Sequence, residues 1–333
     1  MICHQVTKPR SQCSRTRAAL LTYCYHSVYY YYYYLSVNTT GLSVTTTQHP
    51  LNMSKTVTEE QSKCVQQLRE WVNKQPHLPK TIDDKFLLRF AHSCYYDMEK
   101  AKTTINTFFA VRSNCTDLLT KRDPQSPHMQ KILKIINLGT YTTSDQRCLF
   151  LWQINDPGLE NYDYTLDAKL FFLSTDARFL DSDVLHEADI VLMDVKDISL
   201  KFLTKMNVSV ARKLSKYQEE AIPIRLKQVH VVNAPPFIDK IYGVLKPFMK
   251  KEITELIHFH PPNSESLYKY IKKEDLPEDY GGTRPSMAEI TEDTIQLIMR
   301  LRENLIDENL WRVTDKKNDA SIDVGSFRTL AID

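Results

Sequence analysis

The feature that most constrains the fold is a change of apolar period near residue 140. From there on, short apolar runs typical of strands alternate with segments of helical period. The continuous apolar run 188–195 is typical of a strand buried on both faces, and 224–233 reads as another strand. Strands that alternate with helices predict an α/β fold with a mainly parallel sheet.

The other elements of this region follow from the same patterns. Paired strands are predicted on either side of a turn at 144–146. A short strand is predicted at 255–260. Helices are predicted at 165–182, 198–206, 209–220 and 286–312, the last as one long helix.

Before residue 126 the chain has only helical patterns. Thr58 is a predicted N-cap, because Glu59 and Glu60 follow in the first turn. Two further helices are predicted at 81–93 and at 97–115, the second capped by Asp97. Their short connections predict a small helical domain over 58–125, followed by the α/β domain over 126–312.

The two ends of the chain differ from this body in composition. Residues 1–52 contain a tyrosine run and a Ser/Thr tract, with four basic residues and no acidic one. Such a leader superficially resembles a mitochondrial transit peptide. We favour the alternative that it is disordered or not a functional part of the protein, and that Met53 is the natural start. The polar tail 313–333 is predicted to be loose.

Composition argues against several classes of function. With the leader set aside the charge is close to neutral, which argues against a nucleic-acid surface. No apolar run approaches the ~20 residues of a membrane-spanning helix. The seven cysteines are scattered without a CxxC pair, which predicts free thiols in a reducing compartment. We therefore expect a cytoplasmic protein.

The sequence offers little for catalysis. It contains no GxSxG, GxGxxG or GxxxxGK[ST] motif. His258 and His260 have strand spacing, but no third zinc ligand is apparent beside them. Asp194 ends an apolar strand without a partner base, so it is expected to cap a helix or fix a loop. We expect neither an enzyme nor a bound metal or cofactor.

The segment 233–251 is unusual among the predicted helices. Its apolar side chains span an arc of roughly 160°, whereas a surface helix needs about 100°. Pro235 and Pro236 precede it, and Pro247 should end it near Lys246. A fully buried core helix is one interpretation. A cover over an apolar cavity is the other, and it accounts for the width, the brevity and the prolines together.

Two stretches resemble a known family. The segment 86–105, FLLRFAHSCYYDMEKAKTTI, is similar to the N-terminal helical region of CRAL-TRIO lipid-transfer proteins. The elements VHVVN…P, LKPFM, IHFH and LPEDYGGT follow in the order and spacing of their lipid-binding domain. The resemblance covers roughly 58–312, and the branch is that of α-tocopherol transfer protein-like and retinaldehyde-binding proteins.

The resemblance implies a sheet that floors an apolar pocket and a mobile gate helix at 236–246. The expected ligand is a small hydrophobic lipid, such as tocopherol, a retinoid or another isoprenoid, carried between membranes. The residues expected to line the pocket are Phe172, Leu192, Phe202, Val229, Val231, Phe237, Ile238, Ile241, Tyr242, Leu245 and Phe248.

Some family members also bind phosphoinositide headgroups beside the gate. This chain departs from their pattern, with His92 and Cys94 where the tocopherol-transfer branch has arginines, and Glu252 and Leu256 where it has basic residues. The remaining candidate phosphate contacts are Arg225, Lys227, Lys250 and Lys251. For Lys250 and Lys251 the alternative is a solvated basic helix end.

We expect a monomer that associates transiently with anionic membranes. The alternative is an adaptor that uses the same fold to sense lipid or dock on membranes without transferring it.

Overall fold

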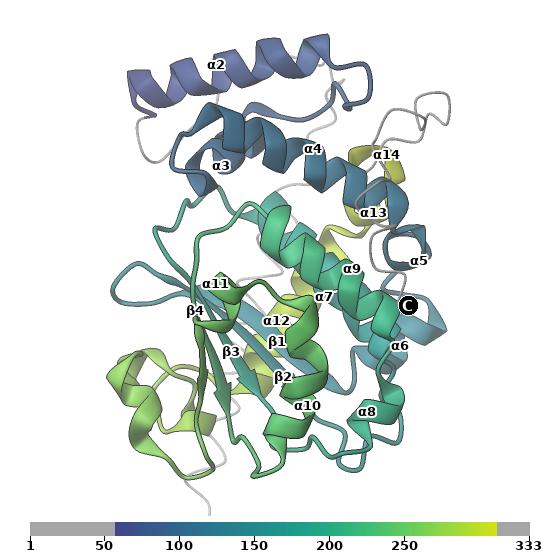
Figure 1. Cartoon of the computed structure of the whole chain (residues 1–333), viewed down its shortest axis with the longest axis vertical. Coiled ribbons are helices and arrows are strands. Elements are labelled where there is room, and N and C mark those ends of the chain that lie inside the picture. Colours follow the sequence, from purple (N-terminus) through teal and green to yellow (C-terminus); the bar gives the residue numbers. More distant parts are fainter. Residues whose placement is uncertain (1–56, 312–333) are drawn as a thin grey trace, which may run out of the picture. The chain divides into compact units, whose positions relative to one another are not determined.

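A five-stranded sheet in the spatial order β1-β2-β3-β4-β5 occupies the middle of the described part, residues 57–311 of a computed structural model (Figure 1). β1 and β2 are antiparallel, and the other neighbours are parallel. The mainly parallel sheet predicted from the sequence is confirmed. The strands are β1 Ile136–Thr142, β2 Cys148–Ile154, β3 Asp189–Asp194, β4 Leu226–Val232 and β5 Ile257–Phe259. The predictions for 1–52 and 313–333 lie outside the described residues.

The N-terminal helices begin at side-chain caps. Thr58 and Gln61 form a capping box at α2, Glu59–Lys74. α3, Asp84–Ser93, begins three residues later than predicted, because the Asp83 carboxylate accepts from Phe86 N–H and fixes the start there. Asp97 caps α4, Met98–Asn114, as predicted. Two short helices that the pattern did not predict follow, α5 Thr116–Leu119 and α6 Pro127–Ile132.

The helices after β2 frame the sheet. Asp163 caps α7, Tyr164–Asp181, and Asn207 caps α9, Val208–Glu220. The remaining helices of this part are α8 Phe202–Lys205, α10 Ile238–Leu245, α11 Lys251–Thr254 and α12 Met287–Arg300.

The prediction of one long helix over 286–312 is wrong. The chain leaves the helical conformation at Leu301 and again at Asp307, which separates α12 from α13, Arg302–Ile306, and α14, Glu308–Trp311. The turns let the Trp311 ring lie 5.0 Å from the guanidinium of the buried Arg112. Trp311 Nε1–H also donates to the carbonyl of Asn304. A straight helix would lose both contacts.

A buried ionic cluster joins the helical region to α7. Asp176 of α7 is fully buried and pairs with Arg112 and Arg122 at 2.5 Å each. Arg112 also donates to the Tyr217 hydroxyl at 2.9 Å. Removing one partner from such a cluster leaves an uncompensated buried charge, so these contacts fix α4 and α9 against α7.

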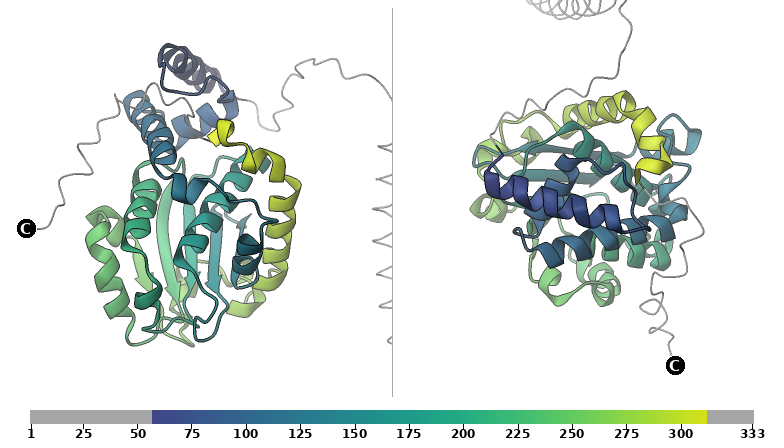
Figure 2. Two further views of the ribbon diagram at one scale, coloured as in Figure 1. Left: turned by 90° about the vertical axis from the view of Figure 1, so that its right-hand side faces the viewer. Right: turned by 90° about the horizontal axis from the view of Figure 1, so that it is seen from above.

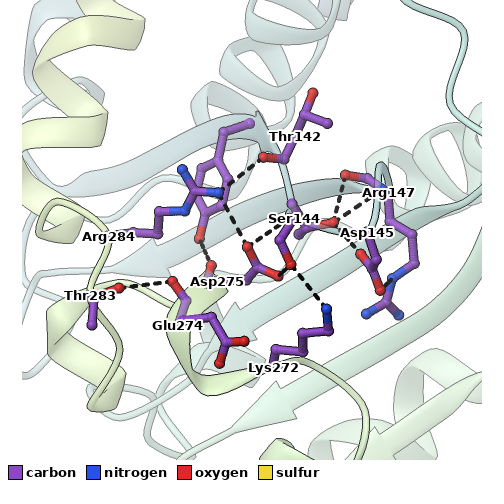
Figure 3. A network of polar contacts seen from close by, with 11 residues as sticks. Thr142, Ser144, Asp145, Arg147, Lys272, Glu274, Asp275, Thr283 and Arg284 are labelled. Carbon is purple, nitrogen blue, oxygen red and sulfur yellow. Dashed lines mark hydrogen bonds and ion pairs between the residues drawn. The ribbon is translucent and has the colours of Figure 1, made fainter.

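A second polar network fixes the β1–β2 turn to the segment 272–284 (Figure 3). The buried Asp275 carboxylate accepts from the backbone N–H and the hydroxyl of Ser144, both at 2.7 Å. Arg284 pairs with the same carboxylate at 3.2 Å. Together these bonds lower the pKa of Asp275, although burial alone would raise it. The network thus ties the β1–β2 turn to the segment that follows β5.

Helices cover both sides of the sheet, with α10 on one side and α12 on the other (Figure 2). The strand register assigns side chains to these sides, because paired residues share a face and neighbours along a strand alternate. We call the two sides the α12 face and the α10 face. The α12 face carries Leu149, Leu151, Ile190 and Leu192. The α10 face carries Ile136, Leu138, Cys148, Phe150, Trp152, Ile154, Val191, Met193, Val229, Val231, Ile257 and Phe259.

Candidate ligand-binding face of the sheet

The α12 face is filled. Its four apolar residues from β2 and β3 are fully buried and cluster with Met287 and Ile290 of α12. Leu267, Ile271 and Leu276 close the same cluster from the segment after β5. This is the packing expected of an α/β sheet between layers of helices.

The α10 face differs, because most of its apolar side chains keep solvent-accessible surface. Val191 and Met193 lie on β3, the middle strand, and both are only half-buried. They belong to none of the three apolar clusters formed within residues 57–311. The other half-buried members are Phe150, Trp152, Val229, Ile257 and Phe259, whereas Val231 and, at the β1–β2 side, Ile136, Leu138, Cys148 and Ile154 are buried. Accessible apolar surface at the centre of a covered sheet indicates incomplete packing on this side.

α10 covers this face at the β4–β5 side. Ile241 is its buried residue and belongs to the cluster that includes Val229 and Val231. The ring of Tyr242 lies 5.3 Å from that of Phe259. The helix ends at Leu245 and a 3₁₀ turn containing Pro247 follows, as the prolines predicted. Its remaining apolar residues are half-buried or exposed, so α10 is not a fully enclosed core helix.

α7 covers the same face farther along the sheet. The Phe171 ring of α7 meets the Phe150 ring edge-to-face at 6.1 Å. Asp167, one helical turn earlier, accepts from Trp152 Nε1–H at 3.0 Å. The hydroxyl of Tyr162 donates to the other carboxylate oxygen of Asp167 at 2.8 Å. A carboxylate therefore sits on the edge of an apolar surface.

The electrostatics of Asp167 reflect this setting. Burial raises its pKa to about 6, against the lowering effect of its bonds to Trp152 and Tyr162. Among residues 57–311 it forms no ion pair with Lys, Arg or His. Its side chain is nevertheless half-buried rather than buried. Asp167 is thus a partly accessible carboxylate without a cationic partner among the described residues.

The structure brings together most of the predicted pocket residues. Val229, Val231, Phe237, Ile238, Ile241 and Leu245 share one cluster with Phe202, which packs against the rings of Tyr162 and Tyr164. Tyr242 reaches the same face through Phe259. Phe248 lies apart, under the guanidinium of Arg212 on α9.

Phe172 and Leu192 do not belong to this group. Phe172 is fully buried among the N-terminal helices, 4.5 Å from the Tyr217 ring. Leu192 is fully buried on the α12 face. Each is one residue away from a side chain on the accessible side, Phe171 on α7 and Met193 on β3. The helical and strand periods turn neighbouring side chains in different directions, and the apolar pattern alone did not indicate which of them faces the space.

Sequence reasoning did not select Trp152, Asp167, Phe171, Val191 or Met193. The available signal was strand alternation: once Val229 and Val231 are placed on one face, the parallel register adds Val191 and Met193. Nothing local marks Asp167, which reads as an acidic residue in the first turn of a helix.

The four predicted phosphate contacts all have partners. Arg225 is buried, pairs with Glu187 and donates to the carbonyl of His92. Lys227 donates to the Tyr95 hydroxyl at 2.5 Å. Lys250 pairs with Glu220 at 2.8 Å and Lys251 with Glu255 at 3.7 Å, and both lysines are exposed. Lys227 is exposed as well, and so is its partner Tyr95, which leaves Arg225 as the one buried residue of the four.

The other polar residues considered from the sequence have structural partners. Asp194 accepts from Gln153, Asn233 and Tyr280 and so fixes the loops at the end of β3, as expected. His260 bonds to His230 at 3.0 Å and to Ser266 at 2.6 Å. Within 57–311 no three His, Cys, Asp or Glu side chains are grouped to hold a metal ion. No helix in that range combines the length and apolarity of a membrane span.

The four cysteines in the described part are free thiols. Two of them, Cys115 and Cys148, are buried, and burial raises the pKa of each thiol to about 11. A thiol with such a pKa is a poor nucleophile at neutral pH.

Known proteins match both regions of the chain. Residues 57–129 match the "Pinta-like, UBA domain" family and residues 143–282 the "CRAL/TRIO domain" family. "Alpha-tocopherol transfer protein-like" of Homo sapiens is 27% identical over 236 residues, 70% of this chain and 68% of that protein. Its Mus musculus counterpart is 27% identical over 225 residues, 66% of this chain and 64% of that protein.

Two further matches extend the comparison. Clavesin-1 of Xenopus laevis is 26% identical over 226 residues, 66% of this chain and 68% of that protein. The crystal structure of Sfh5 covers 75% of this chain and 99% of its own, at 12% identity and a TM-score of 0.41. The matched segments thus span about two thirds of the length of these sequence relatives. Residues 143–282, which include strands β2 to β5, thus match the CRAL/TRIO domain family, and the sequence relatives named above are tocopherol-transfer-like proteins and clavesin.

Proposed function

We propose that this protein binds a small hydrophobic lipid on the α10 face of its sheet and transfers it between membranes. One observation carries the proposal: apolar side chains on the middle strand remain accessible although helices cover them. Exposed apolar surface costs ~25 cal/mol per Å² relative to burial. A lipid bound on this face would bury the apolar surface and gain this free energy, whereas water at the same place would not. The names of the relatives, which include tocopherol transfer, favour the same reading.

The ligand class is an isoprenoid-type lipid of the size of tocopherol or a retinoid. Purified protein extracted with solvent should yield about one lipid per chain by mass spectrometry. Ile241→Asp should abolish loading while the fold survives, because the charge would lie unpaired against the ligand. Lys240→Asp on the exposed side of the same helix is the matched control. Wild-type protein that carries no lipid and takes up none from vesicles would refute the proposal.

We further propose that α10 is the gate through which the lipid enters. The helix is short, is bounded by Pro236 and Pro247, and buries one residue fully. When it opens, its apolar side chains need a bilayer rather than water to receive them. The gate is therefore closed in solution and opens at a membrane surface.

A crosslink between α10 and the sheet tests the gate. Cysteines replacing Tyr242 and Phe259, whose rings face each other, can be joined with a short bifunctional thiol reagent. The crosslinked protein should keep its lipid but stop delivering it to acceptor vesicles. Each single-cysteine variant treated with the same reagent controls for the loss of the rings and for the native thiols. Unimpaired transfer by the crosslinked protein would make α10 a static cover.

Membrane docking is the remaining part of the proposal, with release coupled to anionic lipids such as phosphoinositides. Lys250 and Lys251 follow α10 and are exposed, which supports assigning the contact with the membrane surface to them. Arg225 is available to a headgroup only when Glu187 leaves it. The protein otherwise acts as a monomer in the cytoplasm and catalyses no reaction.

Two variants separate these contributions. Lys250→Glu with Lys251→Glu should weaken binding to anionic vesicles, since each basic residue near such a surface contributes about 1 kcal/mol. The effect should shrink with salt as the Debye length falls below ~10 Å. Glu187→Gln should instead strengthen binding to phosphoinositide vesicles. Lipid loading without transfer to any vesicle would favour a lipid-sensing adaptor.

A further inference from the structure

We propose that Asp167 anchors the polar end of the bound lipid and selects a ligand that ends in a hydroxyl group. The inference rests on the proposed function, because it assumes that a lipid occupies the α10 face. Beyond that function, the inference names the chemical group at the polar end of the lipid and the residue that binds this group.

The geometry places the carboxylate where an end group can reach it. Asp167 bonds to Trp152, which projects from β2 onto the α10 face, and lies one turn before Phe171 on the same side of α7. Tyr162 and Tyr164 around it pack on Phe202, which belongs to the cluster of Ile241 and Val231. One internal wall thus runs from the gate helix to this carboxylate.

The carboxylate is fixed but not saturated. Trp152 and Tyr162 each donate to a different oxygen, which holds the group in one orientation. Two carboxylate oxygens offer about four lone-pair sites, so each keeps room for another donor. No cation among residues 57–311 forms an ion pair with it, as described above. Burial accordingly raises its pKa to about 6, and at neutral pH the group remains mostly a carboxylate.

These properties decide which lipid ends are accepted. An ionised carboxylate accepts hydrogen bonds and donates none. A lipid alcohol or phenol can donate to it, and a hydrogen bond to a charged group is stronger than one between neutral groups. The carbonyl oxygen of a lipid aldehyde is an acceptor, so it cannot donate to the Asp167 carboxylate. A fatty acid would place a second negative charge beside that carboxylate. The site therefore favours alcohols over aldehydes and acids with the same apolar body.

The Asp167→Asn variant tests this assignment, with Asp163→Asn as the matched control. Asp163 caps the same helix four residues earlier at the surface, and asparagine caps equally well. Lipids that copurify with each protein are extracted and identified by mass spectrometry. Each protein is then titrated with retinol, retinal and retinoic acid, which share one apolar body and differ in the end group.

Wild-type protein and the Asp163→Asn control should copurify with lipids that carry a hydroxyl group and prefer retinol about tenfold or more over retinoic acid. In Asp167→Asn this preference should fall to a fewfold, and the copurified lipids should include aldehydes or acids. A wild-type protein filled with fatty acid, or an unchanged lipid population in Asp167→Asn, would overturn the inference and leave the lipid-binding proposal intact. Wild-type protein without any lipid would refute the proposed function itself.

Discussion

The two faces of the sheet are built from alternate residues of the same strands, yet they are packed differently. Leu192 is fully buried on the α12 face. Met193, the next residue, lies on the α10 face and is only half-buried. Both are apolar, so the difference lies in what covers them. The α12 face is filled, whereas the α10 face keeps accessible apolar surface, and this is the surface that we propose binds the ligand. Four predictions test this contrast, from the largest expected effect to the smallest.

Truncation on the two faces should give unequal losses of stability. Leu192→Ala should lower the free energy of unfolding by about 2–5 kcal/mol, because it leaves a cavity in a filled layer. Met193→Ala should cost about 1 kcal/mol or less in lipid-free protein, since its side chain is only partly removed from water. Urea unfolding of the two variants measures the difference. Equal losses would show that both faces are equally well packed.

Adding one carbon to the α12 face should also destabilise the protein. A Cβ at Gly139 would lie 2.3 Å from Ile290 Cγ2 and 3.0 Å from Thr294 Oγ1. Gly139→Ala should therefore cost about 1–3 kcal/mol through overpacking. Ile290→Ala removes the clashing atom, so the double variant should lose less than the two single losses combined. Strict additivity would mean that β1 and α12 are not in close contact.

Neutralising Asp167 on the α10 face should raise the free energy of unfolding, whereas the two changes on the α12 face lower it. Its pKa is raised to about 6, above an unfolded value near 3.9, so its contribution to stability is fully present below pH ~4 and is lost as pH rises through 6. Asp167→Asn should thus stabilise lipid-free protein by about 1–2 kcal/mol at pH 7 and by little at pH 4. Chemical unfolding at both pH values measures this. A stabilisation independent of pH would contradict the raised pKa.

The smallest effect is expected in α10, the helix that we propose as the gate. A Cβ at Gly243 would have no neighbour within 4 Å among residues 57–311. Gly243→Ala should therefore stabilise the protein by about 0.5–1 kcal/mol through the helix propensity of alanine. Thermal unfolding of lipid-free protein gives the value. A loss of stability there would mean that the outer side of α10 is packed as tightly as the α12 face.

Much of the fold was predictable because local patterns and tertiary structure agree. The strands around 188–195 and 224–233 and the caps Thr58 and Asp97 are where the sequence placed them. Helix α10 ends where the sequence places Pro247. The long C-terminal helix was mispredicted because its breaks depend on the contact of Trp311 with Arg112, more than 190 residues earlier in the chain.

The candidate site was predictable only in part, for a reason visible in neighbouring residues. The sequence indicated an apolar cover at Ile241 and an apolar floor at Val229 and Val231, and these do share a cluster. It did not distinguish Phe171 from Phe172 or Met193 from Leu192, since each pair is equally apolar. Which residue of each pair is fully buried depends on the helix or strand that packs against that side of the element.

The sequence by itself determined the alternation of strands and helices after residue 140, the caps Thr58 and Asp97, and the short, proline-bounded helix α10. These follow from apolar period, side-chain caps and the backbone restrictions of proline, which act within a few residues. The tertiary structure alone decided that one face of the sheet is filled and the other is not. It also decided that Asp167 of α7 accepts a hydrogen bond from Trp152 of β2. Such features depend on how distant segments pack against each other, and the apolar pattern within one segment does not predict that packing.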